Sequence, residues 1–156
     1  MSSKNNRFST NKFKPTNSDR FDRNANTREE KKVKDDLPKI VFSFKDFDIK
    51  QIPPGQNYVH WEDNKLLAYM LKKFESICSL NIVEAQQQKL LKIYGSFPAK
   101  TDFKKPQHII DGVNWAVIMD IKGQKARVAG HIIGNIFYVV FLDEDHKFYI
   151  TEKKNT

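Results

Sequence analysis

Four residues near the C-terminus carry the side chains that metal-free cleavage of RNA would require: Arg127, His131, His146 and Tyr149. RNA can be cut by attack of its own 2′-hydroxyl. That reaction needs a base for the hydroxyl, an acid for the leaving 5′-oxygen and a cation for the charged phosphorane. Histidine, tyrosine and arginine are sufficient for these roles without a cofactor. The same side chains can equally form the polar surface of a hairpin, so the elements that position them matter.

The segment from residue 124 to residue 150 predicts three strands. Arg127 and His131 fall on one face of the first, about two pleats apart. Gly134-Asn135 is a two-residue hairpin turn, and IFYVVFLD is apolar on both faces, as a central strand would be. The motif HKFYI predicts a short edge strand with His146 on one face and Lys147 and Tyr149 on the other.

Candidate RNA-binding residues surround these strands. They are Lys100, Lys104, Lys105 and His108, in the Pro-broken loop GSFPAKTDFKKPQH, and Lys147. Structureless loops of this length are uncommon in small domains, so a function for the loop is expected.

Other chemistries lack their motifs. The four histidines are scattered without metal-ligand spacing, and Cys78 is the single cysteine. No Gly-rich phosphate loop and no nucleophile elbow occurs in the chain. We therefore expect neither a metal nor a cofactor, and we expect Cys78 to be a buried apolar residue of a helix.

The elements upstream complete an α+β pattern. KIVFSFKDF alternates like a half-buried strand, and the apolar residues from Leu66 to Cys78 recur at helical spacing. Asn81 and Glu84 in NIVE predict a capping box that starts a second helix. KLLKIYG and WAVIMDIKG predict further strands, the latter closing at Gly123. The predicted fold is an N-terminal strand, two helices on one face of the sheet, and an antiparallel β-meander.

Residues 1–38 differ in composition from the rest of the chain. They hold ten basic and six acidic residues and little apolar surface, so we expect a disordered basic tail before a single domain at 39–156. The tail contributes +4 to a net charge of +8, which favours a polyanionic partner such as RNA. No signal peptide or membrane-length apolar run is apparent, and a cytoplasmic protein without a membrane partner is expected.

The order of these elements, together with GHIIGNIFYVVFLDEDHKFY, resembles the RelE/ParE toxin superfamily. The resemblance implies a RelE-like fold and a toxin that cleaves messenger RNA, often on the ribosome, with an antitoxin protein covering its site. Arg127, His146, Lys147 and Tyr149 would be the counterparts of that family's functional residues. Arg127 would stabilise the transition state, His131 or His146 would act as acid and base, and Tyr149 would position the substrate base.

Two alternatives come from other classes. One is a non-catalytic RNA- or ribosome-binding module that uses the basic tail and the loop from Lys100 to Lys105. The other is a protein–protein adaptor whose charge is incidental.

Overall fold

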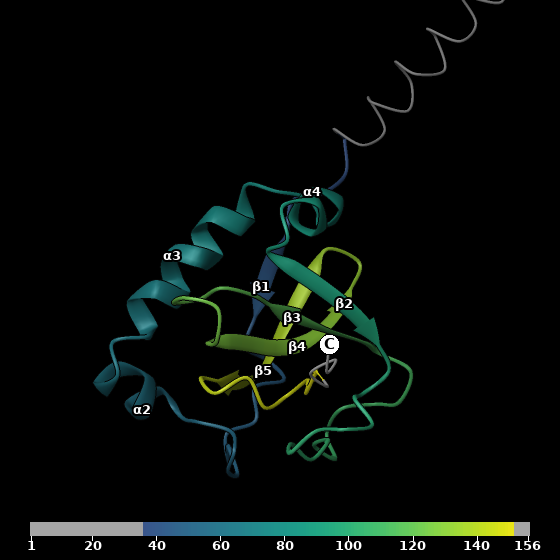
Figure 1. The fold of residues 1–156 in the computed structure, drawn as a ribbon. Helices are drawn as coiled ribbons and strands as arrows, with labels where there is room; N and C mark the ends of the chain where they lie inside the picture. The colour runs from purple at the N-terminus through teal and green to yellow at the C-terminus, as the bar shows by residue number, and fades with distance from the viewer. Residues whose placement is uncertain (1–35, 152–156) are drawn as a thin grey trace, which may run out of the picture. The chain divides into compact units, whose positions relative to one another are not determined.

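The computed structural model describes residues 36–151, so the predicted tail lies outside the described residues up to residue 35. Within the described range the chain forms an α+β domain (Figure 1). The strands are β1 (Val41–Ser43), β2 (Leu91–Gly95), β3 (Asn114–Ile118), β4 (Arg127–Ile133) and β5 (Ile136–Asp143). The helices are α2 (Tyr58–Asp63), α3 (Leu67–Cys78) and α4 (Ile82–Gln87).

The sheet has the order β1-β5-β4-β3-β2. The four strands β2 to β5 form the predicted antiparallel meander, but β1 pairs in parallel with β5, so the sheet is mixed. The prediction of two helices is also wrong, because the described residues contain three. The extra helix, α2, starts at Asn57, whose side chain accepts the backbone N–H of His60 at 2.9 Å.

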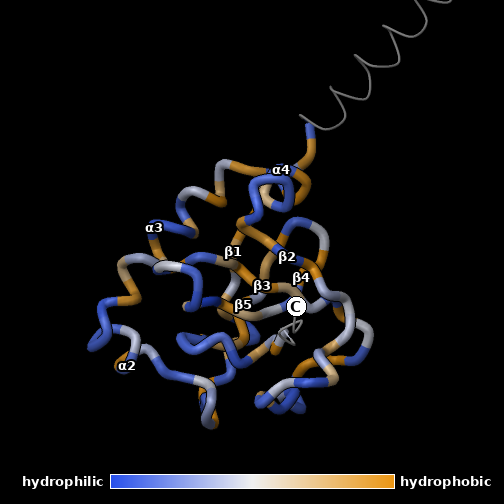
Figure 2. Tube along the Cα trace, in the orientation of Figure 1, coloured by the Kyte–Doolittle hydropathy of each residue, from blue (hydrophilic) through white to orange (hydrophobic). Residues whose placement is uncertain are grey.

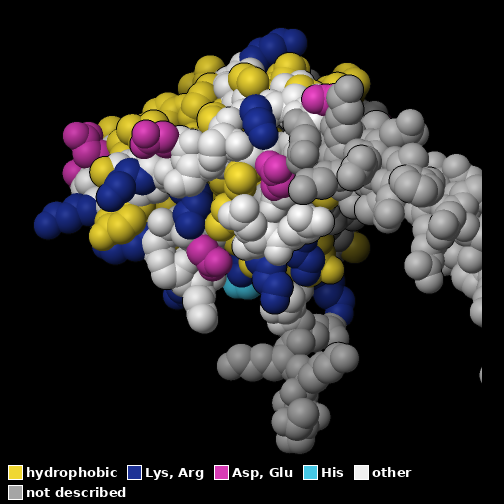
Figure 3. Space-filling view, turned by 90° about the horizontal axis from the view of Figure 1, so that it is seen from above, with side chains coloured by type: hydrophobic (Ala, Val, Ile, Leu, Met, Phe, Trp, Pro, Cys, Tyr) yellow, Lys and Arg dark blue, Asp and Glu magenta, His cyan; other side chains and the backbone are white. Residues whose placement is uncertain are grey.

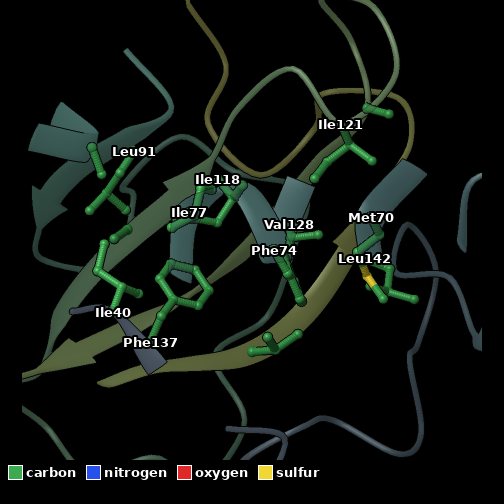
Figure 4. Close-up of a cluster of buried hydrophobic side chains, with 14 of the residues drawn as sticks. Ile40, Met70, Phe74, Ile77, Leu91, Ile118, Ile121, Val128, Phe137 and Leu142 are labelled. Atoms are coloured by element: carbon green, nitrogen blue, oxygen red, sulfur yellow. The ribbon is translucent and has the colours of Figure 1, made fainter. Parts of the chain in front are cut away.

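All three helices contribute to one apolar core on a single face of the sheet, as predicted. From α3, the residues Met70, Phe74 and Ile77 point into this core towards β3, β4 and β5 (Figure 4). In Figure 2 the strands in the middle of the domain are largely apolar, whereas apolar and polar residues alternate along α2 and α3. Cys78 is exposed, which corrects the prediction of a buried thiol: it follows Ile77 by about 100° around the helix and leaves the core-facing stripe.

Two local predictions have different outcomes. The capping box of α4 is confirmed, with Asn81 Oδ1 accepting from Glu84 N and Glu84 Oε2 accepting from Asn81 N, both at 2.9 Å. The strand predicted to close at Gly123 instead ends at Ile118. Asp120 has a φ of 56°, a left-handed conformation that takes the chain out of the sheet before Gly123.

Aromatic residues fill a second core on the opposite face of the sheet. Its members include Phe103, Trp115, Phe141 and Phe148, which come from two strands and from the loops that follow β2 and β5. A bulge in β5 adds a side chain to this second core. The register with β4 skips Val140 between the pairs Ala129–Phe141 and Gly130–Val139. Consecutive side chains, Val140 and Phe141, therefore both enter this second core.

The predicted edge strand HKFYI is wrong, because residues 144–150 form a loop. The edge of β5 where this strand would pair is already occupied. Asp48 N and the Gln51 side-chain amide both donate to Val140 O, at 3.1 and 2.8 Å, and Gln56 N donates to Leu142 O at 3.2 Å. The connection between β1 and α2 thus satisfies the groups that a new strand would need.

Gly130 provides a test of this packing. A Cβ built at Gly130 would lie 1.9 Å from the carbonyl oxygen of Tyr138, so Gly130→Ala must displace backbone. We expect Gly130→Ala to lower the free energy of unfolding by about 3 kcal/mol, the upper end of overpacking costs. Gly134→Ala, in the turn at φ 61° with open space around it, should cost about 1 kcal/mol. Urea unfolding measures both, and an equal loss in the two variants would contradict the close approach at Gly130.

Candidate active site

Arg127, His146 and Tyr149, three of the four predicted catalytic residues, come together at the β2 side of the second core. Tyr149 stacks on Tyr94 of β2, with ring centroids 4.0 Å apart and planes inclined by 16°. Lys92, two residues before Tyr94 on the same strand face, places its Nζ 5.0 Å from the Tyr94 ring centroid and 5.9 Å from that of Tyr149. We refer to Lys92, Tyr94, Arg127, His146 and Tyr149 as the Arg127 cluster.

The guanidinium of Arg127 connects these groups electrostatically. Burial raises the pKa of the Tyr94 phenol, and the nearby Arg127 charge partly opposes that rise. Burial lowers the pKa of His146, and Arg127 lowers it further, while the Asp143 carboxylate acts in the opposite direction. At neutral pH the cluster therefore combines an imidazole able to accept a proton, a phenol that keeps its proton and two cations.

Arg127 also has an unsatisfied donor. Among the residues that the structure describes, the buried side-chain nitrogens that lack a hydrogen-bond partner are Arg127 Nε and His131 Nδ1. Burying a guanidinium N–H without an acceptor is unfavourable, and a phosphate oxygen is the type of acceptor that arginine binds best. The cluster therefore places a buried guanidinium with an unused N–H donor close to Tyr94 and His146.

The loop after β5 brings His146 and Tyr149 into the cluster. Asp143, fully buried at the end of β5, accepts hydrogen bonds from the backbone N–H groups of Lys147 and Phe148, both at 2.9 Å. These bonds turn the chain back on itself, with His146 in a left-handed conformation at φ 58°. Phe148, only 1 % exposed, anchors the loop in the second core, and its neighbours on either side remain partly exposed or exposed.

His131, the fourth predicted catalytic residue, lies elsewhere. It is 2 % exposed, and its ring stacks on Tyr138 with centroids 4.7 Å apart. Its Nε2 lies 2.9 Å from Asp46 Oδ2, and since a carboxylate only accepts, this nitrogen carries the proton. The pair lines a cavity of about 180 Å³ at the far end of β4, about 13 Å along the strand from Arg127. The predicted catalytic set therefore divides into two sites.

The predicted RNA-binding residues also divide. Lys147 is exposed in the loop that carries His146, and its carbonyl oxygen accepts the backbone N–H of Asp102 at 3.4 Å. Lys104, Lys105 and His108 line a separate groove, where Lys105 forms an ion pair with Asp111. Lys100 is exposed in the same long loop. On the face drawn in Figure 3, Lys and Arg side chains are mixed with acidic and apolar side chains.

Sequence reasoning missed Lys92, Tyr94 and Asp46. The first two had a usable signal: positions 92 and 94 in KLLKIYG share a strand face by alternation, and a Lys and a Tyr on one face are suited to nucleic acid. Asp46 had none, because it lies in a turn whose approach to His131, 85 residues later, depends on the parallel pairing of β1 with β5.

Within residues 36–151, no helix combines the length and hydropathy needed to cross a bilayer. No group of three or more histidine, cysteine, aspartate or glutamate side chains there is arranged to hold a metal ion.

The proximity of Arg127 to His146 can be tested without any substrate. We expect an NMR titration of His146 to give a pKa below the ordinary histidine value, and Arg127→Gln to raise that pKa because it removes a neighbouring positive charge. Lys39→Gln, which removes a cation at the opposite end of the domain near Glu84, should leave it unchanged. An identical His146 titration in the wild type and in Arg127→Gln would show that the two side chains do not share a site.

Comparison with known proteins adds no relative to this geometry: no family model, no curated protein and no solved structure matches the chain.

Proposed function

We propose that this protein is a metal-independent endoribonuclease of the RelE-like toxin type that acts on messenger RNA, in association with the ribosome, through the Arg127 cluster. The observation that carries the proposal is the convergence of Arg127, His146 and Tyr149 with Tyr94 at one position on the sheet. The element order of one strand, helices and antiparallel strands supports the RelE-like part of the proposal. A cognate antitoxin would be the protein partner.

Each step of cleavage has a group in the cluster. Neutral His146 removes the proton from the 2′-hydroxyl, whose oxygen attacks the adjacent phosphorus, and Arg127 and Lys92 offset the negative charge of the phosphorane. The bond to the 5′-oxygen then breaks, and the Tyr94 hydroxyl supplies the proton to that leaving oxygen. The products are a 2′,3′-cyclic phosphate and a 5′-hydroxyl, and proton transfer from imidazolium to phenolate through solvent restores the enzyme.

His131 of β4 and His146 of the loop after β5 have different roles in this proposal. Because His131 is 2 % exposed and held by Asp46, a 2′-hydroxyl has no access to its ring. His146 is partly exposed and lies within the electrostatic influence of Arg127. His146 is therefore the general base, and His131 stabilises the connection that follows β1.

Cleavage of RNA by the purified protein tests the proposal. New 5′-hydroxyl ends should form on messenger RNA, faster when ribosomes are translating it, and slower cleavage of the free RNA should persist in the presence of EDTA. Arg127→Ala and His146→Ala should each lower the rate by about 10²- to 10⁴-fold, the range for loss of a catalytic base or an oxyanion contact. His60→Ala, which removes an exposed histidine paired with Glu144, is the matched control and should retain the wild-type rate.

Two outcomes would contradict the catalytic assignment: cleavage of free RNA that EDTA abolishes, and variants of Arg127 and His146 that cut RNA as fast as the wild type. Salt-sensitive RNA binding without new ends, weakened by removal of residues 1–38, would instead identify the non-catalytic RNA-binding module. The observation that favours this second candidate is the charge of +4 carried by residues 1–38.

A further inference from the structure

A groove of about 780 Å³ lies on the sheet face opposite the helices, and none of its lining residues belongs to the Arg127 cluster. It is enclosed by two segments far apart in sequence, residues 45–53 before α2 and residues 102–108 after β2. In Figure 1 both segments lie below the sheet, away from α3 and α4. The buried rings of Phe103 and Phe141, 4.7 Å apart between centroids, form part of its floor.

Two aliphatic side chains at the edge of the groove, which we call its lip, are largely exposed. Ile49 is 88 % exposed and Ile52 is 61 % exposed, and both belong to the short connection that holds the edge of β5. Neighbouring exposed apolar residues with a polar rim are typical of protein interaction sites. Burial of both isoleucines by a partner would remove this apolar surface from water.

The aromatic residues of the groove are poorly placed for stacking on nucleic-acid bases. Phe103 is 4 % exposed and Phe141 is 2 % exposed, so both rings are covered. One face of the Phe47 ring is occupied by Tyr58, with centroids 4.6 Å apart and planes inclined by 11°. Single-stranded nucleic acid binds by stacking on open aromatic faces, and of these three rings two are buried and the third is stacked on one side.

The rim of the groove is positively charged. The lining contains four lysines and two aspartates, Lys45, Lys50, Lys104, Lys105, Asp48 and Asp102, for a net charge of +2, which becomes +1 when Asp111, the ion-pair partner of Lys105, is included. The chain's own residues 1–38 carry +4 and are therefore unsuitable as an occupant. A segment that pairs carboxylates with aliphatic side chains would match both the rim and the lip.

We propose that this groove binds an acidic, aliphatic peptide segment of a partner protein. The occupant places branched apolar side chains against Ile49 and Ile52 and carboxylates against Lys50 and Lys104. This site is separate from the Arg127 cluster and does not depend on the proposed RNA cleavage.

Selection from a displayed library of random 12-residue peptides, carried out on the full chain, tests the groove. Enriched peptides should combine Asp or Glu with Leu, Ile or Val, and their affinity should fall as salt is raised. The double variant Ile49→Ser/Ile52→Ser should weaken the best synthetic peptide at least tenfold, as expected for apolar contacts at the centre of an interface. Lys104→Glu should weaken it further.

Matched controls remove equally exposed groups elsewhere. Leu71, 60 % exposed on α3, and its neighbour Lys72 lie outside the groove, so Leu71→Ser and Lys72→Glu should leave peptide affinity within about twofold of wild type. Thermal melts confirm that each variant is folded. The proposal is overturned if no acidic–aliphatic peptide is enriched, or if the Ile49/Ile52 variant binds the peptide as tightly as wild type. It is also overturned if that variant loses affinity for an oligouridine RNA or an anionic phosphatidylglycerol vesicle instead of the peptide.

Discussion

The buried carboxylate of Asp143 determines where the candidate site forms. Asp143 is fully buried at the end of β5, where burial raises its pKa and the two backbone N–H bonds from Lys147 and Phe148 oppose that rise. An aspartate is costly in such a position unless its oxygens are satisfied. Here they are satisfied by the chain immediately following, which must therefore fold back rather than extend. The ordering of His146 and Tyr149 is a direct consequence of that turn.

The second core limits where function can reside on this face. Phe103, Trp115, Phe141 and Phe148 cover the middle of the sheet, so polar side chains reach solvent only around its periphery. The Arg127 cluster lies at the β2 side, and the His131–Asp46 pair lies at the opposite end of β4. One strand face that holds both Arg127 and His131 therefore contributes to two sites with different surroundings. The two sites differ in exposure: the Arg127 cluster presents partly exposed rings, whereas the His131 ring is buried.

Local signals in the sequence were sufficient for most of the fold. The Gly134-Asn135 turn, the capping box at Asn81 and the apolar run 136–143 each depend on neighbours within a few residues, and each was predicted correctly. Contacts between distant segments were not predictable in this way. The alternation in HKFYI favours a strand, but the edge of β5 is taken by Asp48, Gln51 and Gln56, about 90 residues earlier. For the site, residue type indicated Arg127, His146 and Tyr149 as candidates, but the edge strand predicted for the last two was wrong and placed them on opposite faces. The turn held by the buried Asp143 brings them to one place, and the separation of His131 depends on Asp46.

The most direct measurement of whether the Arg127 cluster is one catalytic site is a double-mutant cycle on the rate of RNA cleavage. It compares Arg127→Ala, His146→Ala and the combination of both with the wild type. If both side chains act on the same phosphate, the double variant should be little slower than the slower single variant, because either loss already disables the same step. Rate losses that simply multiply, or a wild-type protein that releases no cyclic-phosphate ends, would contradict a shared site.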